Sequence, residues 1–393
     1  MRNRMIRLLT VGLVTFASAC LGSAGEAPSP PVTRGEAAFG PPDSLILWRG
    51  DRQVAAYRNL PEIFPTRTIE AGSDPLPLPS RSADFSSFSF EAGGETYDLD
   101  RFIEDTRIAG LLVLKNGEIA LERYALGNTA ASLWVSYSIS KSVVSLLMGA
   151  ALRDGYIRDL EDSVADYLPV LEGTVYEAVT LRDALQMASG VEWTDGYNAL
   201  DTNFNRSLTM PTLEQLHGLG ARERVAAPGA RFNYNSAETH LLGTVLRAAI
   251  GNNLATYLSQ KIWRPLGMEA DGNWMLVEPD GGEHGGCCFS ATLRDYGRLG
   301  LFAMRGGVLP TGEQVLADGW MEASLTPSQA NPGYGYLWWL RGEGAFAAIG
   351  IFGQVIWVDP AEDLVIVTHG AWPQASALYG RVYAFAEAVR EAL

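Results

Sequence analysis

Lysine is scarce in this chain of 393 residues: Lys115, Lys141 and Lys261 stand against 27 arginines. The net charge is −15, and no cluster of basic residues occurs beyond the first seven positions. A nucleic-acid surface needs clustered positive charge, so we expect no nucleic-acid partner. Because a buried lysine can lose its proton and act as a base, whereas arginine stays charged, the scarcity draws attention to Lys141.

Cysteine and histidine are also rare, with three and four residues. Cys287 and Cys288 are adjacent and follow His284, but no second Cys or His pair stands at metal-ligand spacing. We therefore expect no metal, and no organic cofactor either. The two cysteines are either free and buried or joined in a vicinal disulfide.

Long apolar runs are missing too. The run from Leu8 to Phe16 follows three arginines and is too short to span a bilayer, which is the layout of an export signal over residues 1–19. Cleavage by ordinary signal peptidase would follow Ala19. The stretch Ala17 to Cys20 also resembles a bacterial lipobox, and we favour this interpretation: a periplasmic protein held at the membrane by a lipid on Cys20.

The rest of the chain predicts an α+β protein. Residues 20–43 are rich in Pro, Gly, Ser and Ala and read as a flexible tether, and residues 44–98 as an arm packed across the domain at 99–393. In that domain, two apolar runs around Asn116-Gly117 predict a hairpin. Roughly residues 155–280 carry helical periodicity.

Strand patterns return after Tyr334, and the chain closes with an amphipathic helix at about 375–393. Strands at both ends predict an antiparallel sheet built from N- and C-terminal segments and flanked by helices, with an inserted all-α lobe. The pocket is expected between sheet and lobe.

Ser138 and Lys141 are the strongest pair of candidate catalytic residues. Apolar residues recur at three- and four-residue spacing up to Ala151, which predicts a buried helix with Ser138 in its first turn. Residues three apart share a helix face, so the Lys141 amine would reach the Ser138 hydroxyl. This is the Ser-Lys form of an activated nucleophile. The alternative is a polar helix start with a solvated lysine.

Two further segments could complete such a site. Tyr234 follows a Pro-Gly turn and precedes a helix, where its hydroxyl could protonate a leaving group. Gly350 lies inside an apolar strand and could let a carbonyl oxygen reach the N–H of Ile351, while that of Ser138 donates the second bond. Alternatively, Tyr234 is a packed core ring and Gly350 marks a β-bulge.

Together these segments resemble the serine β-lactamase and penicillin-binding-protein superfamily. The likeness is carried by SISK, YNS and a late strand that runs into GQVIWVDP, and it covers about residues 99–393. SGVEW, CCFSATLRDYGRLG and YGYLWW are also similar to the class C β-lactamase-like branch, which includes esterases and 6-aminohexanoate-oligomer hydrolases. The resemblance implies a β-lactamase-like fold, Ser138 as acyl nucleophile, Lys141 as base, Tyr234 as proton shuttle, and an oxyanion hole formed by the N–H groups of Ser138 and Ile351.

The same resemblance places Tyr197, Ser236, Gly350 and Phe352 at the substrate site. Tyr197 is a candidate lid over the acyl group, with core packing as the alternative. Two departures bear on the substrate. Ser236 stands where members that act on β-lactams commonly have asparagine, and Ala348 stands where they have lysine or histidine. Losing that cation argues against an anionic β-lactam or peptide terminus as the main substrate, and both departures look like the esterase and 6-aminohexanoate-hydrolase side of the branch.

We therefore expect an exported serine hydrolase that acts on a small ester or unstrained amide. One alternative keeps the chemistry and makes the substrate a β-lactam or a D-alanyl-D-alanine peptide. Another is a non-catalytic envelope protein that binds ligands in the same cleft. The oligomeric state stays open.

Overall fold

The computed structural model describes residues 39–393. The predicted leader, Cys20 and nearly all of the tether lie outside the described residues. Within residues 39–393, no helix has both the length and the apolar character needed to cross a membrane.

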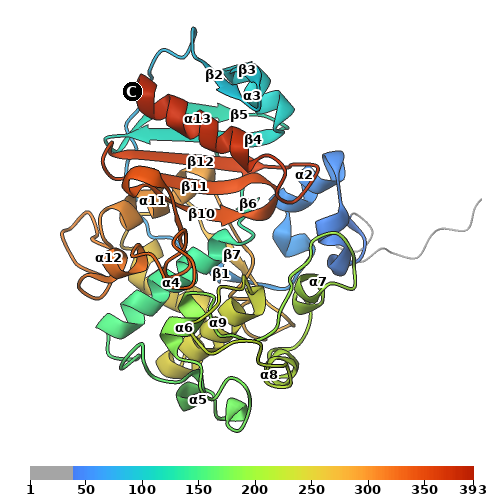
Figure 1. Ribbon diagram of the computed structural model, residues 1–393. Coiled ribbons are helices and arrows are strands. Elements are labelled where there is room, and N and C mark those ends of the chain that lie inside the picture. The colour runs from blue at the N-terminus through green and yellow to red at the C-terminus, as the bar shows by residue number, and fades with distance from the viewer. Residues whose placement is uncertain (1–38) are drawn as a thin grey trace, which may run out of the picture. The chain divides into compact units, whose positions relative to one another are not determined.

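The main sheet joins segments from both ends of the chain, as predicted. Its six antiparallel strands are ordered β5-β4-β12-β11-β10-β9. They are β4 (Ile108–Lys115), β5 (Glu118–Tyr124), β9 (Trp339–Leu340), β10 (Phe346–Gly350), β11 (Gln354–Asp359) and β12 (Leu364–Gly370). Figure 1 shows β4 beside β12 at the centre of this sheet. The hairpin at Asn116 and Gly117 is confirmed, and both residues have the positive φ of a type I′ turn.

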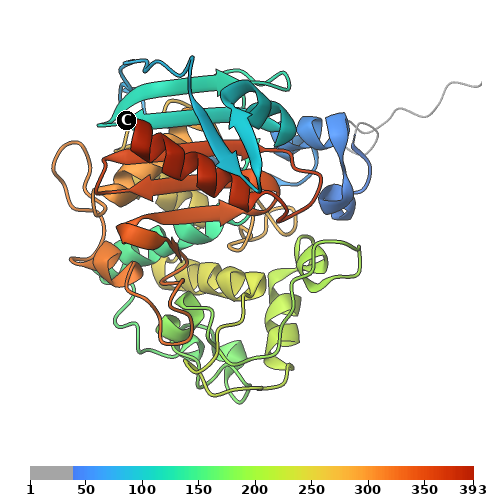
Figure 2. The ribbon, with the colours of Figure 1, turned by 45° about the horizontal axis from the view of Figure 1, so that its top comes forward.

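Both faces of this sheet are buried, because alternate side chains of its central strands enter different cores. In β12, Leu364 and Ile366 enter one core, whereas Val365 and Val367 enter the other. The first core is covered by α13 (Tyr379–Ala392), α3 and the β2–β3 hairpin, as Figure 2 shows. The second core is formed with α11 and α4. These covering elements are α3 (Leu99–Asp105), β2 (Ser89–Ala92), β3 (Glu95–Asp98), α4 (Ile139–Arg153) and α11 (Leu293–Met304). The closing helix begins at Tyr379, later than expected.

A second sheet corrects the expected limits of the helical lobe. Its order is β1-β7-β8-β6, formed by β1 (Thr66–Ile69), β6 (Trp134–Val135), β7 (Gly272–Met275) and β8 (Phe289–Ala291). Strand β7 falls inside the span expected to be all helical. Its partner β1 comes from the N-terminal arm, and a pairing between such distant segments leaves no local periodicity to read. The arm also places α2 (Gly50–Arg58) beside β6.

The inserted lobe is helical up to Trp263. Its helices are α5 (Val164–Tyr167), α6 (Leu181–Leu185), α7 (Asn203–Ser207), α8 (Thr212–Gly220), α9 (Ser236–Ile250) and α10 (Leu254–Leu258), and α10 runs into a π-helical turn at Ser259–Trp263. Helix α6 ends at Leu185, and Met187, two residues later, takes a left-handed φ of 54°. The remaining short helix, α12 (Trp320–Ser324), packs against Gly149 of α4.

Candidate active site

Ser138 lies in the tight turn between β6 and α4. Tyr137, the residue before it, has a φ of 44°, a left-handed conformation that L residues rarely adopt. Ser136 fixes the turn to β8, because its N–H donates to the Phe289 carbonyl at 2.7 Å and its Oγ accepts from the Phe289 N–H at 2.9 Å. The strained turn therefore presents Ser138 at the N-terminus of a buried helix, where N–H groups favour negative charge.

Lys141 lies one helical turn after Ser138, and its side chain is buried. Its Nζ donates to the Ser138 Oγ at 2.9 Å and to the Gly286 carbonyl oxygen at 2.5 Å. Burial lowers the pKa of Lys141 to about 8, although the negative charge of Asp195 opposes that shift. Roughly one-tenth of the amine is then neutral at pH 7, and neutral amine can take the proton of Ser138.

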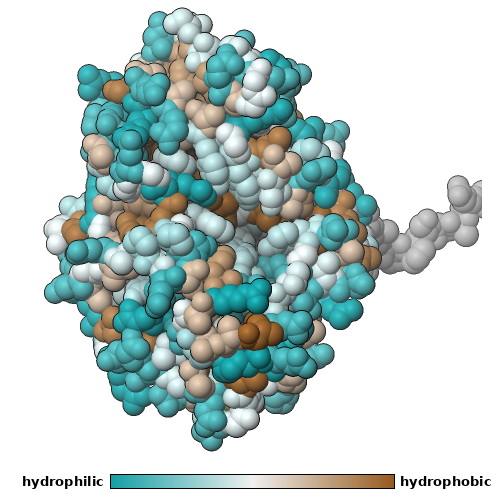
Figure 3. Space-filling model, viewed as in Figure 1, coloured by the Kyte–Doolittle hydropathy of each residue, from teal (hydrophilic) through white to brown (hydrophobic). Residues whose placement is uncertain are grey.

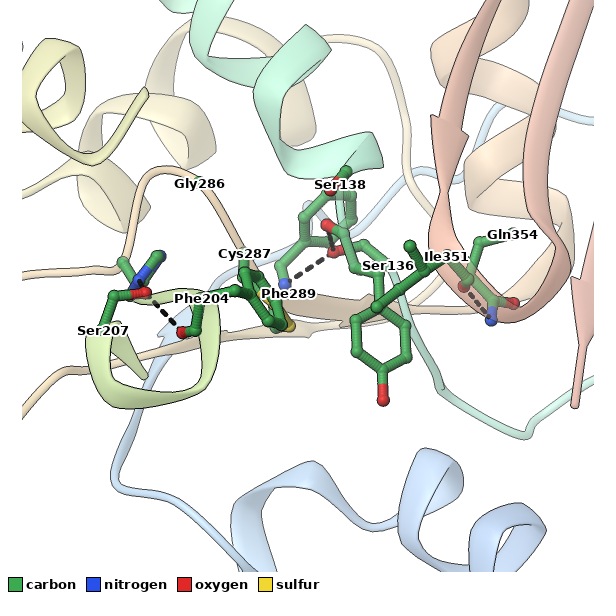
Figure 4. Close-up of a disulfide and its surroundings, with 12 residues drawn as sticks. Ser136, Ser138, Phe204, Ser207, Gly286, Cys287, Phe289, Ile351 and Gln354 are labelled. Carbon is green, nitrogen blue, oxygen red and sulfur yellow. Dashed lines mark hydrogen bonds between the residues drawn. A yellow bond between two sulfur atoms is a disulfide. The ribbon is translucent and has the colours of Figure 1, made fainter. Parts of the chain in front are cut away.

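Two glycines bring the Gly286 carbonyl to Lys141. A Cβ at Gly286 would lie 2.2 Å from the Ser236 carbonyl oxygen, and one at Gly285 would lie 2.4 Å from that of Thr239. Only glycine therefore lets this loop approach α9 so closely. The loop continues into Cys287 and Cys288, which are joined in a disulfide; Figure 4 shows it beside Ser138 and Phe289.

Tyr234 comes to the same place from the loop that precedes α9. Its ring centre lies 5.2 Å from the Lys141 Nζ. Burial raises the pKa of Tyr234 above its ordinary value, and a hydrogen bond with Ser138 opposes the rise. The next residue, Asn235, caps α9 by accepting from the N–H groups of Ala237 and Glu238, which fixes the end of this loop. Ser138, Lys141 and Tyr234 thus form one cluster.

Gly350 brings the end of β10 against the turn that carries Ser138. A Cβ on Gly350 would lie 2.4 Å from the Ser136 carbonyl oxygen and 3.0 Å from the Ser138 nitrogen. Strands β10 and β11 pair in register up to Gly350, without a bulge. Because Gly350 has no side chain, the end of β10 can approach the backbone of Ser136 and Ser138. This approach leaves Ile351 and Ser138 lining one cavity, where both N–H groups could bind an oxyanion.

This cavity has a volume of about 410 Å³. Of the residues singled out from the sequence, Ser138, Tyr197, Tyr234 and Ile351 line it. Sequence reasoning missed several other lining residues: Trp339 and Arg341 at β9, Ser376 in the loop before α13, and Tyr379 and Tyr383 in α13. Trp339 ends the YGYLWW segment, the only signal that pointed toward it. The face of the molecule in Figure 3 is hollowed between the sheet and the helical lobe.

Two predicted substrate-binding side chains do not reach the cavity. Ser236 is fully buried, and its Oγ donates to the Asp195 carboxylate at 2.6 Å. Phe352 has a φ of 64° and packs its buried ring against Tyr57 and Tyr137, away from the cavity. The Asp195 carboxylate therefore holds the Ser236 side chain inside the protein, and the surrounding aromatic rings hold the Phe352 side chain there.

Asp195 was missed as a member of the site, although it lies in the WTDGY stretch. Its carboxylate accepts from the Trp193 indole at 2.5 Å, the Tyr197 hydroxyl at 2.7 Å, and both the N–H and the hydroxyl of Ser236. It thereby ties Tyr197 to the start of α9. Among residues 39–393, no group of three or more His, Cys, Asp or Glu side chains is arranged to hold a metal ion.

Comparisons with known proteins show what the chain is similar to as a whole. The family model described as Beta-lactamase matches residues 99–377. A 6-aminohexanoate-dimer hydrolase of Paenarthrobacter ureafaciens is 29% identical over 307 residues, covering 70% of this chain and 76% of that protein. A Bacillus anthracis structure, provisionally assigned the same activity, superposes with a TM-score of 0.78 at 22% identity over 87% of this chain and 93% of that one. EstCE1, a hydrolase with promiscuous acyltransferase activity, superposes with a TM-score of 0.59 at 18% identity over 75% of this chain and 95% of that one.

Proposed function

Since the chain belongs to the β-lactamase family, we propose that it is a serine hydrolase that cleaves an ester or an unstrained amide through an acyl-enzyme on Ser138. One observation carries this proposal: the Nζ of a buried lysine lies 2.9 Å from the Ser138 Oγ, on a cavity that Tyr234 also lines. A solvated surface lysine would give neither the lowered pKa nor this contact.

The reaction uses these groups in sequence. Neutral Lys141 takes the Ser138 proton as Oγ attacks the substrate carbonyl carbon, and the N–H groups of Ser138 and Ile351 stabilise the oxyanion. Tyr234 gives its proton to the leaving oxygen or nitrogen as the bond to carbon breaks, and it regains a proton from Lys141. Water then attacks the acyl ester by the reverse route, which releases the acid and restores Ser138.

Two features favour an ester or unstrained amide over a β-lactam. Strand β10 presents Ala348 where β-lactam-hydrolysing members commonly carry a cation, and the Ser236 hydroxyl is engaged by Asp195. The similar protein of P. ureafaciens bears a name that denotes hydrolysis of a 6-aminohexanoate dimer, which supports an amide.

The Ser138→Ala variant tests this proposal. It should lose at least about 1,000-fold of the kcat for a p-nitrophenyl ester, because the acyl-enzyme cannot form. Ser145→Ala is the matched control: Ser145 lies on the same helix, is buried, and its hydroxyl has no partner in the described residues. Full activity in Ser138→Ala would refute the proposal. Rapid nitrocefin hydrolysis by the unaltered protein would make β-lactams the substrate instead.

We also propose that the protein is exported and anchored through a lipid on Cys20. The apolar run and the cysteine after Ala19 support this. Radiolabelled fatty acid should be incorporated into the full chain and not into Cys20→Ala; equal incorporation by both would contradict the anchor.

A further inference from the structure

Arg341 is the only formally charged residue among those that line the cavity. It follows β9, and its guanidinium lies 4.2 Å from the ring centre of Tyr383 and 5.9 Å from that of Trp339. Its Nη2 donates to the Tyr383 hydroxyl at 2.7 Å. The aromatic rings and this hydrogen bond hold the cation at one wall of the cavity.

No carboxylate in the described part of the chain lies within 4.0 Å of the Arg341 guanidinium, although the sequence contains 45 acidic residues and only 30 basic ones. Glu343, two residues further on, pairs with Arg390 instead. The Arg341 Nε is buried and donates to no acceptor in residues 39–393. A partly buried guanidinium without an anion is costly, so the site is short of one negative group.

A row of rings connects this cation to the reacting groups. Lys141 lies 5.2 Å from the Tyr234 ring centre, the Tyr234 and Trp339 ring centres are 5.8 Å apart, and Arg341 follows Trp339. Two aromatic rings therefore stand in this row of contacts between Lys141 and Arg341. Apart from Ser138, Ser376 and Arg341, the side chains that line the cavity are aliphatic or aromatic, which suits a hydrocarbon spacer.

We propose that Arg341 binds a carboxylate at the end of the substrate remote from the reacting bond. The proposal rests on the hydrolase function above and narrows its substrate class: an ester or amide that carries a carboxylate on an apolar spacer. A planar guanidinium matches a carboxylate in geometry as well as charge. This cation follows β9, whereas the position on β10 that carries a cation in β-lactam-hydrolysing members is Ala348.

Two pairs of substrates test this, since the carboxylate could belong to either product. One pair is the mono-p-nitrophenyl ester of a dicarboxylic acid and its methyl-capped form. The other is an N-acetylated ω-amino acid and its carboxamide. In at least one pair the unaltered protein should favour the carboxylate by about 10- to 100-fold in kcat/KM, and about 0.5 M salt should reduce this preference.

Arg341→Met should remove the preference, measured as the ratio of the kcat/KM values for the carboxylate and the neutral member of each pair. Arg341→Lys keeps the positive charge and should retain part of the preference for the carboxylate. If Arg341→Met does not fold, the preference shown by Arg341→Lys and its dependence on salt decide whether Arg341 binds the carboxylate. Arg381→Gln is the control, because it removes the same charge outside the cavity. The proposal would be overturned if the unaltered protein preferred the carboxylate in neither pair. It would also be overturned if Arg341→Met preferred the carboxylate as strongly as the unaltered protein does.

The two proposals fail in different ways. If neither substrate pair is hydrolysed and Ser138 is not labelled by a fluorophosphonate, the hydrolase function is wrong. If both members of each pair are hydrolysed equally well, only the role of Arg341 is wrong.

Discussion

Replacing Gly350 by alanine places one methyl group between β10 and the turn that carries Ser138. The backbone of Gly350 has a φ of −112°, which alanine adopts without strain, so the effect is purely steric. The new Cβ would lie 2.4 Å from the Ser136 carbonyl oxygen, 3.0 Å from the Ser138 nitrogen and 3.0 Å from the Tyr137 Cβ.

Ordinary Cβ contacts begin at 3.4 Å, so the strand or the turn must move by about 1 Å. Either movement separates the N–H groups of Ser138 and Ile351. A displacement of about 1 Å at reacting groups can cost about 100-fold in rate, and overpacking costs about 1–3 kcal/mol of stability. We therefore expect Gly350→Ala to lose about 100-fold in kcat and to unfold at lower denaturant concentration.

The assay is p-nitrophenyl ester hydrolysis well below the unfolding temperature of each variant, with unfolding followed separately. Gly218→Ala is the control: Gly218 lies in α8, and its added Cβ would meet nothing within 4 Å. That variant should keep its kcat. A Gly350→Ala protein that is folded and turns over at the rate of the unaltered protein would refute the steric argument.

Two predictions concern pH. Because burial lowers the pKa of Lys141 to about 8 and only the neutral amine is a base, kcat/KM should rise with pH to a plateau, with a midpoint near 8. Initial rates from about pH 6 to about pH 10 check this; Lys141→Arg should be inactive throughout, and a pH-independent rate would contradict the assignment. Burial also raises the pKa of Glu238 to about 7, against hydrogen bonds from Ser189, Tyr176 and Asn235. The folded state then keeps a proton that the unfolded state releases near pH 4.5, so the free energy of unfolding should fall by about 3 kcal/mol as pH rises from about 4.5 to about 7, and level off above. Urea unfolding at several pH values should show this slope in the unaltered protein and not in Glu238→Gln; the same slope in both would exclude Glu238 as its source.

Local sequence patterns predicted those parts of the site whose geometry depends on a single segment of the chain. The three-residue spacing of Ser138 and Lys141 places both on one turn of a helix whose apolar periodicity is plain in the sequence. The Asn116-Gly117 hairpin and the long apolar strands followed from equally local signals. Tyr234 and Ile351 were candidates from their own segments, but only the resemblance favoured them, because those segments alone do not distinguish a catalytic tyrosine from a packed one or an oxyanion hole from a β-bulge.

The walls of the cavity could not be predicted in the same way. Arg341 follows a strand of only two residues, and its place beside Tyr383 depends on how α13 crosses the sheet. Ser236 turns toward Asp195, 41 residues earlier in the chain, so its role depends on a distant contact. Phe352 leaves the cavity because of one left-handed φ, a backbone choice that its own residue type disfavours.

Covalent labelling of the nucleophile is the most direct test of the proposal that hydrolysis proceeds through an acyl-enzyme on Ser138. The unaltered protein is treated with a fluorophosphonate until ester hydrolysis stops, digested, and mapped by mass spectrometry. One adduct per chain should be found, on Ser138, and its formation should parallel the loss of activity. Hydrolysis that continues after Ser138 is fully modified, or an adduct on another residue that accounts for the inhibition, would contradict a Ser138 acyl-enzyme.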